Sequence, residues 1–501
     1  MNSANPKYGI TGPASLKEST QESTQLANQM DKYLRESNFF ESEDAGQTRE
    51  RVLGRLDFLV KKFVEKTAPE GEQKNYGGKI FTFGSYRLGV HDRGADIDVL
   101  CVVPRHVSRK DFFTIFYEEL GQDENVKEIS KIEDAYVPII SLTYDGIPID
   151  LTFARLNLPV IAENISLLND TILRSMDEKC ILSLNGSRVT DAILRLIPRV
   201  DVFHSALRAI KFWAKRRYIY GNAYGYFGGV TFSICVARIC QMYPNLCAYD
   251  IVCKFFETYS SWKWPTPVQL CSIVDHNYNL KVWDPKVYPA DKYHKMPVIT
   301  PVYPSINSTH NVTQSTFILI CSELARGNEL MRSKAPFSKL FEVSGFFKKH
   351  KMFIEVRINS EDLQAFNIWE GYIQSKIRIL CTKLENLENI SLAAPFPKAF
   401  TGRSCKASNT DNIGGAASTG SKSSGISNKI EEYFTLFYIA VDVSINPSSS
   451  KKIFVGEPIG DFLNFVNSWE GKLPEMKIEI NSKKKKEIQS MDFIKNLEQD
   501  K

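Results

Sequence analysis

Two aspartates separated by a single residue are the part of this sequence best suited to chemistry. Asp96 and Asp98 open an apolar run that reads A-D-I-D-V-L-C-V-V. Because residues i and i+2 of a β-strand project from the same face, the two carboxylates would lie side by side. Hard oxygen ligands held in this way suit Mg²⁺, which takes one or two carboxylates and completes its shell with substrate phosphates. The spacing therefore predicts metal-assisted chemistry on a phosphate substrate.

A small turn precedes this pair at Phe83-Gly84-Ser85. Glycine has no Cβ, so the backbone of such a turn can approach a triphosphate closely and point N–H groups at its oxygens. The Ser85 hydroxyl adds a further hydrogen-bonding group. An isolated Asp-x-Asp is most often a solvated turn or a cap, whereas a glycine-serine turn at this distance favours nucleotidyl transfer.

A third carboxylate is predicted on a neighbouring strand. Residues 138–144 and 147–153 are apolar runs separated by Asp145-Gly146, the strongest short-range signal for a β-hairpin. Alternation of apolar residues in the second run leaves Asp150 on the opposite face. A charged residue in the middle of such a strand is costly to bury unless it is paired or binds a metal. Three carboxylates on neighbouring strands predict a two-metal site.

The composition is ordinary for a globular protein. The chain has 501 residues, enough for two or three domains with substantial cores. It has no apolar run long enough to span a membrane, and its start lacks the apolar core of a secretory signal. Its ten cysteines include no C-x-x-C, which indicates buried free thiols in a reducing compartment. The net charge of +5 permits nucleic-acid binding without arguing for it.

The run G-S-Y-R-L-G-V-H-D-R-G-A-D-I-D, which ends at Asp98, resembles the catalytic signature of the eukaryotic nuclear poly(A) polymerases. These enzymes are members of the DNA polymerase β-like nucleotidyltransferase superfamily. The resemblance continues in order from roughly residue 75 to residue 320. Its further segments are 183–191, 207–217, 219–222, 228–230, 283–285, 293–297 and 307–312.

The resemblance implies an α+β architecture. It consists of a nucleotidyltransferase mixed-sheet catalytic domain, a helical middle domain and an RRM-like α/β sandwich that contacts RNA. No RNP1-type aromatic signature is visible in the last domain, so stacking of bases on its sheet is not supported. With the apolar patterns, the expected divisions are a polar N-terminal segment at 1–20, the catalytic domain at 21–200, the middle domain at 201–346, the RRM-like domain at 347–480 with a flexible insertion at 403–428, and a basic tail at 481–501.

Within the last domain, alternation predicts strands over 352–358 and 433–443, and a further short strand over 452–455. An apolar stripe at helical spacing predicts a helix between Trp369 and Leu380. These elements do not specify a fold by themselves, so the RRM-like assignment rests on the resemblance.

The activity that the resemblance implies is that of a polynucleotide adenylyltransferase, which adds AMP from ATP to an RNA 3′-hydroxyl without a template and releases pyrophosphate. Asp96, Asp98 and Asp150 would be catalytic and would hold two Mg²⁺ ions, or Mn²⁺ in their place, with Asp150 nearer the attacking hydroxyl. The other matched positions would bind the nucleotide: Gly84 and Ser85 at the phosphates, Lys211 and Tyr220 at the triphosphate, Asn185 at the ribose, and Phe83, Gly229 and Val230 around the adenine.

Some of these positions have simpler interpretations. From the residues alone, Lys211 would be a solvated surface lysine on a helix. Asp92 departs from the animal and fungal pattern, because a negative charge beside a triphosphate is unfavourable unless it points outward or reaches a cation such as Arg93. Asp92 is therefore left out of the predicted site. His91 and His294 have no second ligand at metal-binding spacing and are expected to be structural.

Two basic runs have open assignments. The run at 215–217 would either contact the RNA backbone or form a solvated helix end. The run at 483–486 would be a nuclear-import signal or a polybasic tail.

Two rival functions share parts of the pattern. A related RNA uridylyltransferase or oligoadenylate synthetase would keep the aspartates and differ in base and acceptor. An inactive RNA-binding scaffold is expected to lose at least one of them. The expected partners are an RNA 3′ end, ATP and proteins of the mRNA 3′-end processing complex, with the chain a monomer in the nucleus and away from membranes.

Overall fold

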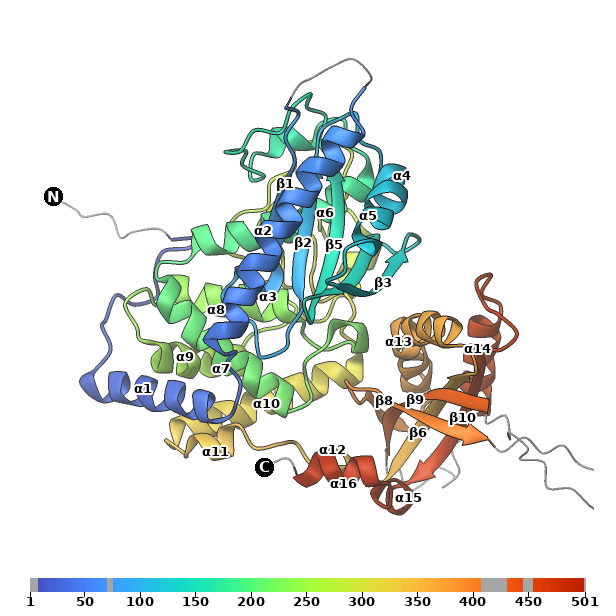
Figure 1. Cartoon of the computed structure of the whole chain (residues 1–501). Helices are drawn as coiled ribbons and strands as arrows, with labels where there is room; N and C mark the ends of the chain where they lie inside the picture. Colours follow the sequence, from blue (N-terminus) through green and yellow to red (C-terminus); the bar gives the residue numbers. More distant parts are fainter. Residues whose placement is uncertain (1–7, 70–74, 407–429, 445–453, 500–501) are drawn as a thin grey trace, which may run out of the picture. The chain divides into compact units, whose positions relative to one another are not determined.

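The computed structural model describes residues 8–69, 75–406, 430–444 and 454–499 (Figure 1). The chain forms two compact units, and each is described by itself. The first consists of the described parts of residues 1–214, 227–310 and 323–341. The second consists of 215–226, 311–322 and the described parts of 342–501.

The first unit is built on a five-stranded sheet in the order β1-β2-β5-β4-β3. Strands β2 and β5 are parallel, whereas the other neighbours are antiparallel, so the predicted mixed sheet is confirmed. The strands are β1 (Lys79–Phe83), β2 (Ile97–Val103), β3 (Val126–Ile132), β4 (Ile139–Tyr144) and β5 (Ile147–Arg155).

The hairpin between β4 and β5 forms as predicted. Asp145 and Gly146 have φ angles of 48° and 78°. Two successive positive φ values are the requirement of a type I′ turn, which matches the right-handed twist of the flanking strands. The turn fixes the register in which Ser141 faces Asp150.

Strand β2, which has a neighbour on each side in the sheet, is apolar on both faces. Val99 to Val103 of β2 are almost fully buried, which is typical of a strand covered by helices on both sides. Helix α2 packs against β1, and helix α6 packs against β1, β2 and β5. These helices hold the end of β2 that carries the aspartates.

Helices account for the rest of the first unit. The predicted helical pattern after residue 20 forms α1 (Gln21–Glu36) and α2 (Glu43–Lys66), which begin at the side-chain caps Thr20 and Ser42. The others are α3 (Gly84–Arg87), α4 (Arg109–Asp111), η1 (Phe112–Phe116), α5 (Tyr117–Gly121), η2 (Asp170–Leu173), α6 (Glu178–Leu196), α7 (Val200–Arg216), α8 (Gly229–Met242), α9 (Ala248–Ser260), η4 (Pro289–Tyr293), α10 (Gln314–Arg332) and α11 (Phe337–Leu340), of which α7 and α10 also contribute residues to the second unit.

The described part of the polar N-terminal segment lies against this unit without regular structure. The N–H of Ala14 donates to the carbonyl of Met242 at 2.8 Å, and Nδ2 of Asn245 donates to the carbonyl of Leu16 at 2.7 Å. The segment therefore packs against the end of α8 and the loop that follows it. Within the described residues, no helix is both long and apolar enough to cross a membrane.

The second unit is an α/β domain on a five-stranded antiparallel sheet, whose order is β10-β6-β9-β7 with β8 also paired to β9. Helix α13 packs against β6, β7 and β9. The elements are η3 (Asn222–Tyr224), α12 (Phe346–Lys349), β6 (Met352–Ser360), α13 (Leu363–Glu385), β7 (Ile390–Pro395), β8 (Phe400–Lys406), β9 (Ile430–Val443), α14 (Gly456–Asn467), β10 (Lys477–Lys484), α15 (Lys485–Gln489) and α16 (Asp492–Gln499).

The structure differs from the sequence pattern at three places in this unit. The predicted strand over 452–455 is wrong in its described part, since Phe454 is irregular and Val455 precedes α14. Residues 403–406 of the expected insertion belong to β8, and 407–428 lie outside the described residues. The expected basic tail contains the end of β10 and the helices α15 and α16.

Candidate active site

Three carboxylates meet at one end of β2 and β5. Asp98 and Asp150 are direct partners in the parallel ladder, and Asp96 stands immediately before β2 begins. Each aspartate offers an oxygen that lies within 4.8 Å of an oxygen of the other two. Oxygens this close can share divalent cations, so the convergence predicted from the sequence is confirmed.

Mutual repulsion and burial hold this cluster in an unusual protonation state. Burial, together with the neighbouring charges of Asp96 and Asp150, raises the pKa of Asp98 to about 7. The pKa of Asp150 is also raised, mainly by burial, although a hydrogen bond from Ser141 opposes the effect. Concentrated negative charge of this kind is the environment that a divalent cation stabilises.

Gly84 is required by its position against Asp98. Its φ is +62°, and a Cβ built on it would lie 2.0 Å from Oδ2 of Asp98. Any side chain here would displace the carboxylate. The N–H of Gly84 donates to Oγ1 of Thr190 at 3.3 Å, so this amide points at α6, while Ser85 occupies the next position, inside α3.

Two residues expected at the nucleotide, Phe83 and Asn185, lie at helix α6. The Phe83 ring packs onto Gly186, where a Cβ would lie 2.6 Å from the ring carbons. Oδ1 of Asn185 is buried and has no hydrogen-bond partner among the described residues. Since buried polar atoms are nearly always paired, this acceptor is suited to a ligand hydroxyl or a bound water.

Lys211 is not the solvated surface lysine that the helical pattern alone suggests. It is 2% exposed, and its Nζ donates to the carbonyl of Val90 at 2.8 Å. Nζ also lies 3.7 Å from Oδ1 of Asp92. Lys211 is therefore a cation near Asp92, where the sequence suggested one such as Arg93. A buried ammonium beside the turn-to-strand loop is well placed for an anion.

The other predicted nucleotide residues fall in two places. Gly229 and Val230 begin α8 in the first unit, and Val230 is 37% exposed. Tyr220 belongs to the second unit, where Nζ of Lys215 lies 5.3 Å from the centroid of its ring. The roles of these three residues at the nucleotide stay predictions.

The histidines have protein partners. His91 Nε2 lies 3.3 Å from Oε2 of Glu41, and Nδ1 of His294 accepts a hydrogen bond from Nε1 of Trp283 at 3.1 Å. Burial lowers the pKa of both histidines. These contacts agree with the structural roles expected for them.

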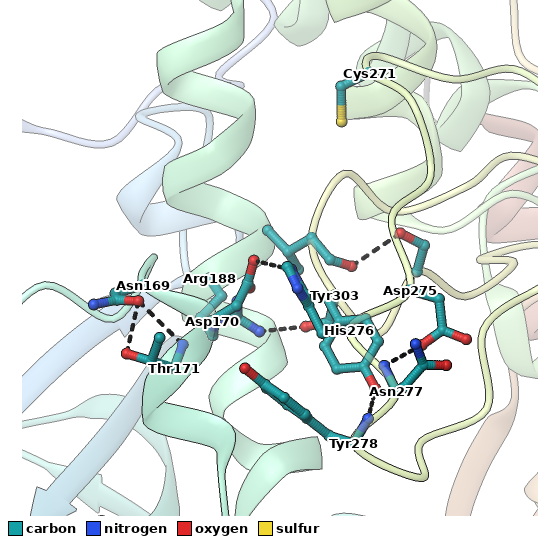
Figure 2. A network of polar contacts seen from close by, with 12 residues as sticks. Asn169, Asp170, Thr171, Arg188, Cys271, Asp275, His276, Asn277, Tyr278 and Tyr303 are labelled. Carbon is teal, nitrogen blue, oxygen red and sulfur yellow. Dashed lines mark hydrogen bonds and ion pairs between the residues drawn. The ribbon is translucent and has the colours of Figure 1, made fainter.

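Sequence reasoning missed the groups that hold α6 in place. Arg188 is fully buried, and its Nε donates to the carbonyl of Leu167 at 2.8 Å. It also contacts Asp170 and the carbonyl of Tyr303 (Figure 2). Oδ2 of Asp170 lies 2.9 Å from Nε2 of His276, so one arginine joins α6 to two loops. A charged residue on an otherwise apolar helix face was the available signal.

A mixed sheet that brings three carboxylates together beside a glycine turn defines a metal-dependent nucleotidyltransferase. The sequence profile of the poly(A) polymerase nucleotidyltransferase domain matches residues 9–197, that of the poly(A) polymerase central domain matches 202–343, and that of the poly(A) polymerase predicted RNA binding domain matches 345–500. The chain belongs to the poly(A) polymerase family and is a polynucleotide adenylyltransferase.

Two curated relatives come from Candida albicans. Poly(A) polymerase PAPa is 41% identical over 494 residues, which cover 93% of this chain and 89% of the relative. Poly(A) polymerase PAPalpha is 42% identical over 480 residues, covering 91% and 86%. A solved structure of Cid1, described as an RNA terminal uridylyl transferase, is 16% identical with a TM-score of 0.43 and covers 65% of this chain and all of that one. The family assignment therefore rests on the sequence matches.

Proposed function

We propose that this enzyme transfers AMP from ATP to the 3′-hydroxyl of RNA without a template, as in mRNA polyadenylation. The observation that carries the proposal is the approach of three carboxylates within 4.8 Å of one another, beside a glycine that cannot be replaced. In the reaction the RNA 3′-oxygen attacks the α-phosphorus of ATP. The bond to the β-phosphate oxygen breaks, and pyrophosphate leaves.

The aspartate cluster fits a pair of Mg²⁺ ions, with Mn²⁺ as the other candidate. Asp96, Asp98 and Asp150 are hard oxygen donors with uncompensated charge, and these are the properties of such sites. Bound there, the cations would lower the pKa of the attacking hydroxyl and neutralise charge on the triphosphate. Asp150 lies on the strand farther from the glycine turn, so we assign it to the hydroxyl side.

Asp98 would lose a proton when the site is loaded. Its pKa of about 7 means that a large fraction of this carboxyl is protonated at neutral pH. Since metal ligands must be deprotonated, cation binding and proton release are coupled at this residue. The affinity for the cation should then rise with pH through the neutral range.

The surrounding residues would bind and orient ATP. We assign Gly84, Ser85 and Lys211 to the phosphates, Asn185 to the ribose and Phe83 to the adenine. The buried acceptor on Asn185 and the buried ammonium of Lys211 support these roles. We keep three further assignments from the family resemblance: Gly229 and Val230 at the adenine, and Tyr220 at the triphosphate.

We further propose that the enzyme works as a monomer in the nucleus with proteins of the mRNA 3′-end processing complex. The run at 483–486 is the feature that suggests nuclear import. Part of it serves the fold, since Nζ of Lys483 lies 3.7 Å from Glu355 and Nζ of Lys485 donates to the carbonyl of Lys348. Localisation of a tagged chain, with and without Lys484→Ala and Lys486→Ala, would test the import role.

Of the basic run at 215–217, we do not assign Arg217 to RNA, because it is buried and bonded within the protein. It is 5% exposed, and its Nη1 donates to the carbonyl of Glu342 at 2.7 Å. We assign any contact with the RNA backbone to the less buried members of the run, Lys215 and Arg216.

A primer-extension assay with each of the four nucleoside triphosphates tests the proposal. An unstructured RNA should be lengthened with ATP and a divalent cation, and pyrophosphate should be released. Asp150→Ala should abolish extension while the fold is kept. Preference for UTP would show that the base is not adenine. Oligomers made without a primer would show that RNA is not the acceptor. Cation-dependent release of pyrophosphate by Asp150→Ala would reject the site.

A further inference from the structure

A buried ion pair lies outside the residues assigned to metal and nucleotide. Arg49 of α2 contacts Glu41, which precedes that helix, with its Nε 2.8 Å from Oε2 and its Nη2 2.8 Å from Oε1. The Arg49 side chain is 2% exposed and that of Glu41 is 12% exposed. The pair is bidentate, which fixes the plane of the guanidinium as well as its position.

The same guanidinium reaches the residue before the first aspartate. Nη2 of Arg49 donates to the carbonyl of Ala95 at 2.6 Å. Asp96 follows Ala95 and precedes β2, so the strand ladder that fixes Asp98 does not extend to it. The N–H of Ala95 bonds locally, to the carbonyl of Asp92 at 3.1 Å. Arg49 therefore ties the backbone of the aspartate segment to α2.

The pair also contacts the other end of the loop, after the glycine-serine turn. Nε2 of His91 lies 3.3 Å from Oε2 of Glu41. The ring of Tyr86, next to Ser85, has its centroid 6.0 Å from the Arg49 guanidinium carbon and 5.2 Å from the His91 ring. The loop between the phosphate-facing turn and Asp96 therefore contacts the Arg49–Glu41 pair at both of its ends.

Stability is a weak reason for such a pair. The desolvation of two buried charges offsets most of their attraction, and a well-packed apolar group would serve the fold about as well. The planar guanidinium fork of Arg49 bonds one carboxylate and one carbonyl in fixed directions, which an apolar group cannot do. The geometry suits the placement of a backbone segment.

We infer that Arg49 and Glu41 are positioning residues that set the distance between the phosphate-facing turn and Asp96. The inference rests on the proposed function, because it assigns Asp96 to the cation. Without the fork, the carbonyl of Ala95 loses its anchor, and Asp96 samples positions from which its oxygen cannot reach the shared cation. Partners of this kind outside the ligand shell change metal affinity or activity by roughly 10–100-fold.

Arg49→Lys tests this directly, since it keeps the charge and removes the fork. Electron paramagnetic resonance measures Mn²⁺ binding, and the part of it that Asp150→Ala removes is the binding at the aspartates. We expect Arg49→Lys to weaken the affinity of this binding by ~10–100-fold. The turnover of AMP addition should fall, whereas the KM for the RNA primer should change little. Glu41→Gln keeps the size of the side chain but replaces one acceptor oxygen with an NH2 donor, which breaks the bidentate contact. It should shift Mn²⁺ binding in the same direction and serves if Arg49→Lys does not fold.

Arg238→Lys is the matched control. Arg238 is also a buried arginine in the first unit, and it donates to Gln241 and Thr11. It should leave Mn²⁺ affinity unchanged. Unchanged Mn²⁺ affinity in folded Arg49→Lys or Glu41→Gln would overturn the inference. Absence of Asp150-dependent Mn²⁺ binding in the unaltered chain would instead overturn the proposed metal site.

Discussion

Asp98 and Asp150 occupy the same position in two parallel strands, so their side chains project from neighbouring backbones toward one face. The pairing places two carboxylates where burial and repulsion both disfavour the second charge. The fold therefore carries an electrostatic penalty that a bound cation would remove, and this penalty has measurable consequences.

The first consequence is a pH dependence of stability that Asp98→Asn should reduce. A carboxyl whose folded pKa lies above its unfolded pKa adds stability below the unfolded value, near 4, and loses it as the pH rises through about 7. Asp98→Asn should thus raise the free energy of unfolding at pH 8 by about 2–4 kcal/mol, measured with urea and EDTA. Equal pH profiles for both proteins between pH 4 and 8 would contradict the assignment.

Gly84→Ala should inactivate the enzyme through one methyl group. The new Cβ would lie 2.0 Å from Oδ2 of Asp98, so the carboxylate must move. We expect AMP addition to fall by ~100-fold or more, on the scale of a misplaced catalytic group. Gly94→Ala is the control: Gly94 has a φ of +73° but open space around its Cβ. Similar activity losses in both variants would assign the effect to backbone strain.

Asp92→Asn should tighten ATP binding. The Asp92 carboxylate lies 3.7 Å from Nζ of Lys211 and competes with phosphate for the same ammonium. Removal of this charge should lower the KM for ATP by roughly 3–10-fold, equivalent to about 1 kcal/mol. A raised KM would mean that Asp92 instead orients Lys211 for the nucleotide.

Arg188→Met should destabilise the first unit without specific loss of chemistry. It breaks the contact with Asp170 and leaves the carbonyl of Leu167 without its buried donor. The expected loss is about 3 kcal/mol in urea unfolding, with AMP addition per folded molecule within a few-fold of the unaltered chain. Arg174→Met is the control, since exposed Arg174 also contacts this network, at the Tyr278 hydroxyl, and its loss should be less than about 1 kcal/mol. Equal losses would show that burial of the arginine is unimportant.

The aspartate site was predictable because its signals are local. Alternation predicts that Asp96 and Asp98 share one face, although Asp96 itself lies just before β2. The turn at Asp145-Gly146 predicts the hairpin strand that carries Asp150. These two steps depend on residues close in sequence, whereas the pairing of β2 with β5 that joins them does not. The strand-rich catalytic segment and the helices around it follow from the same short-range patterns.

The supporting contacts were not predictable in this way. Arg49 and Ala95 are separated by 46 positions, and no periodicity links them. Lys211 follows an apolar residue on a helix, and its burial depends on a loop that comes from a distant part of the chain. The strand predicted over 452–455 is wrong in its described part for a different reason. A pattern of four residues cannot distinguish a strand from the residues that precede a helix.

The pairing of β2 with β5 also determines when the active site comes into being during folding. Its ligands come from segments 52 positions apart, counted from Asp98 to Asp150, and parallel neighbours always need a long crossover. Such non-local pairing forms slowly, because the chain loses loop entropy before the contacts form. A nascent chain that ends before β5 therefore has no complete cation site, and catalytic competence arises only together with the finished sheet.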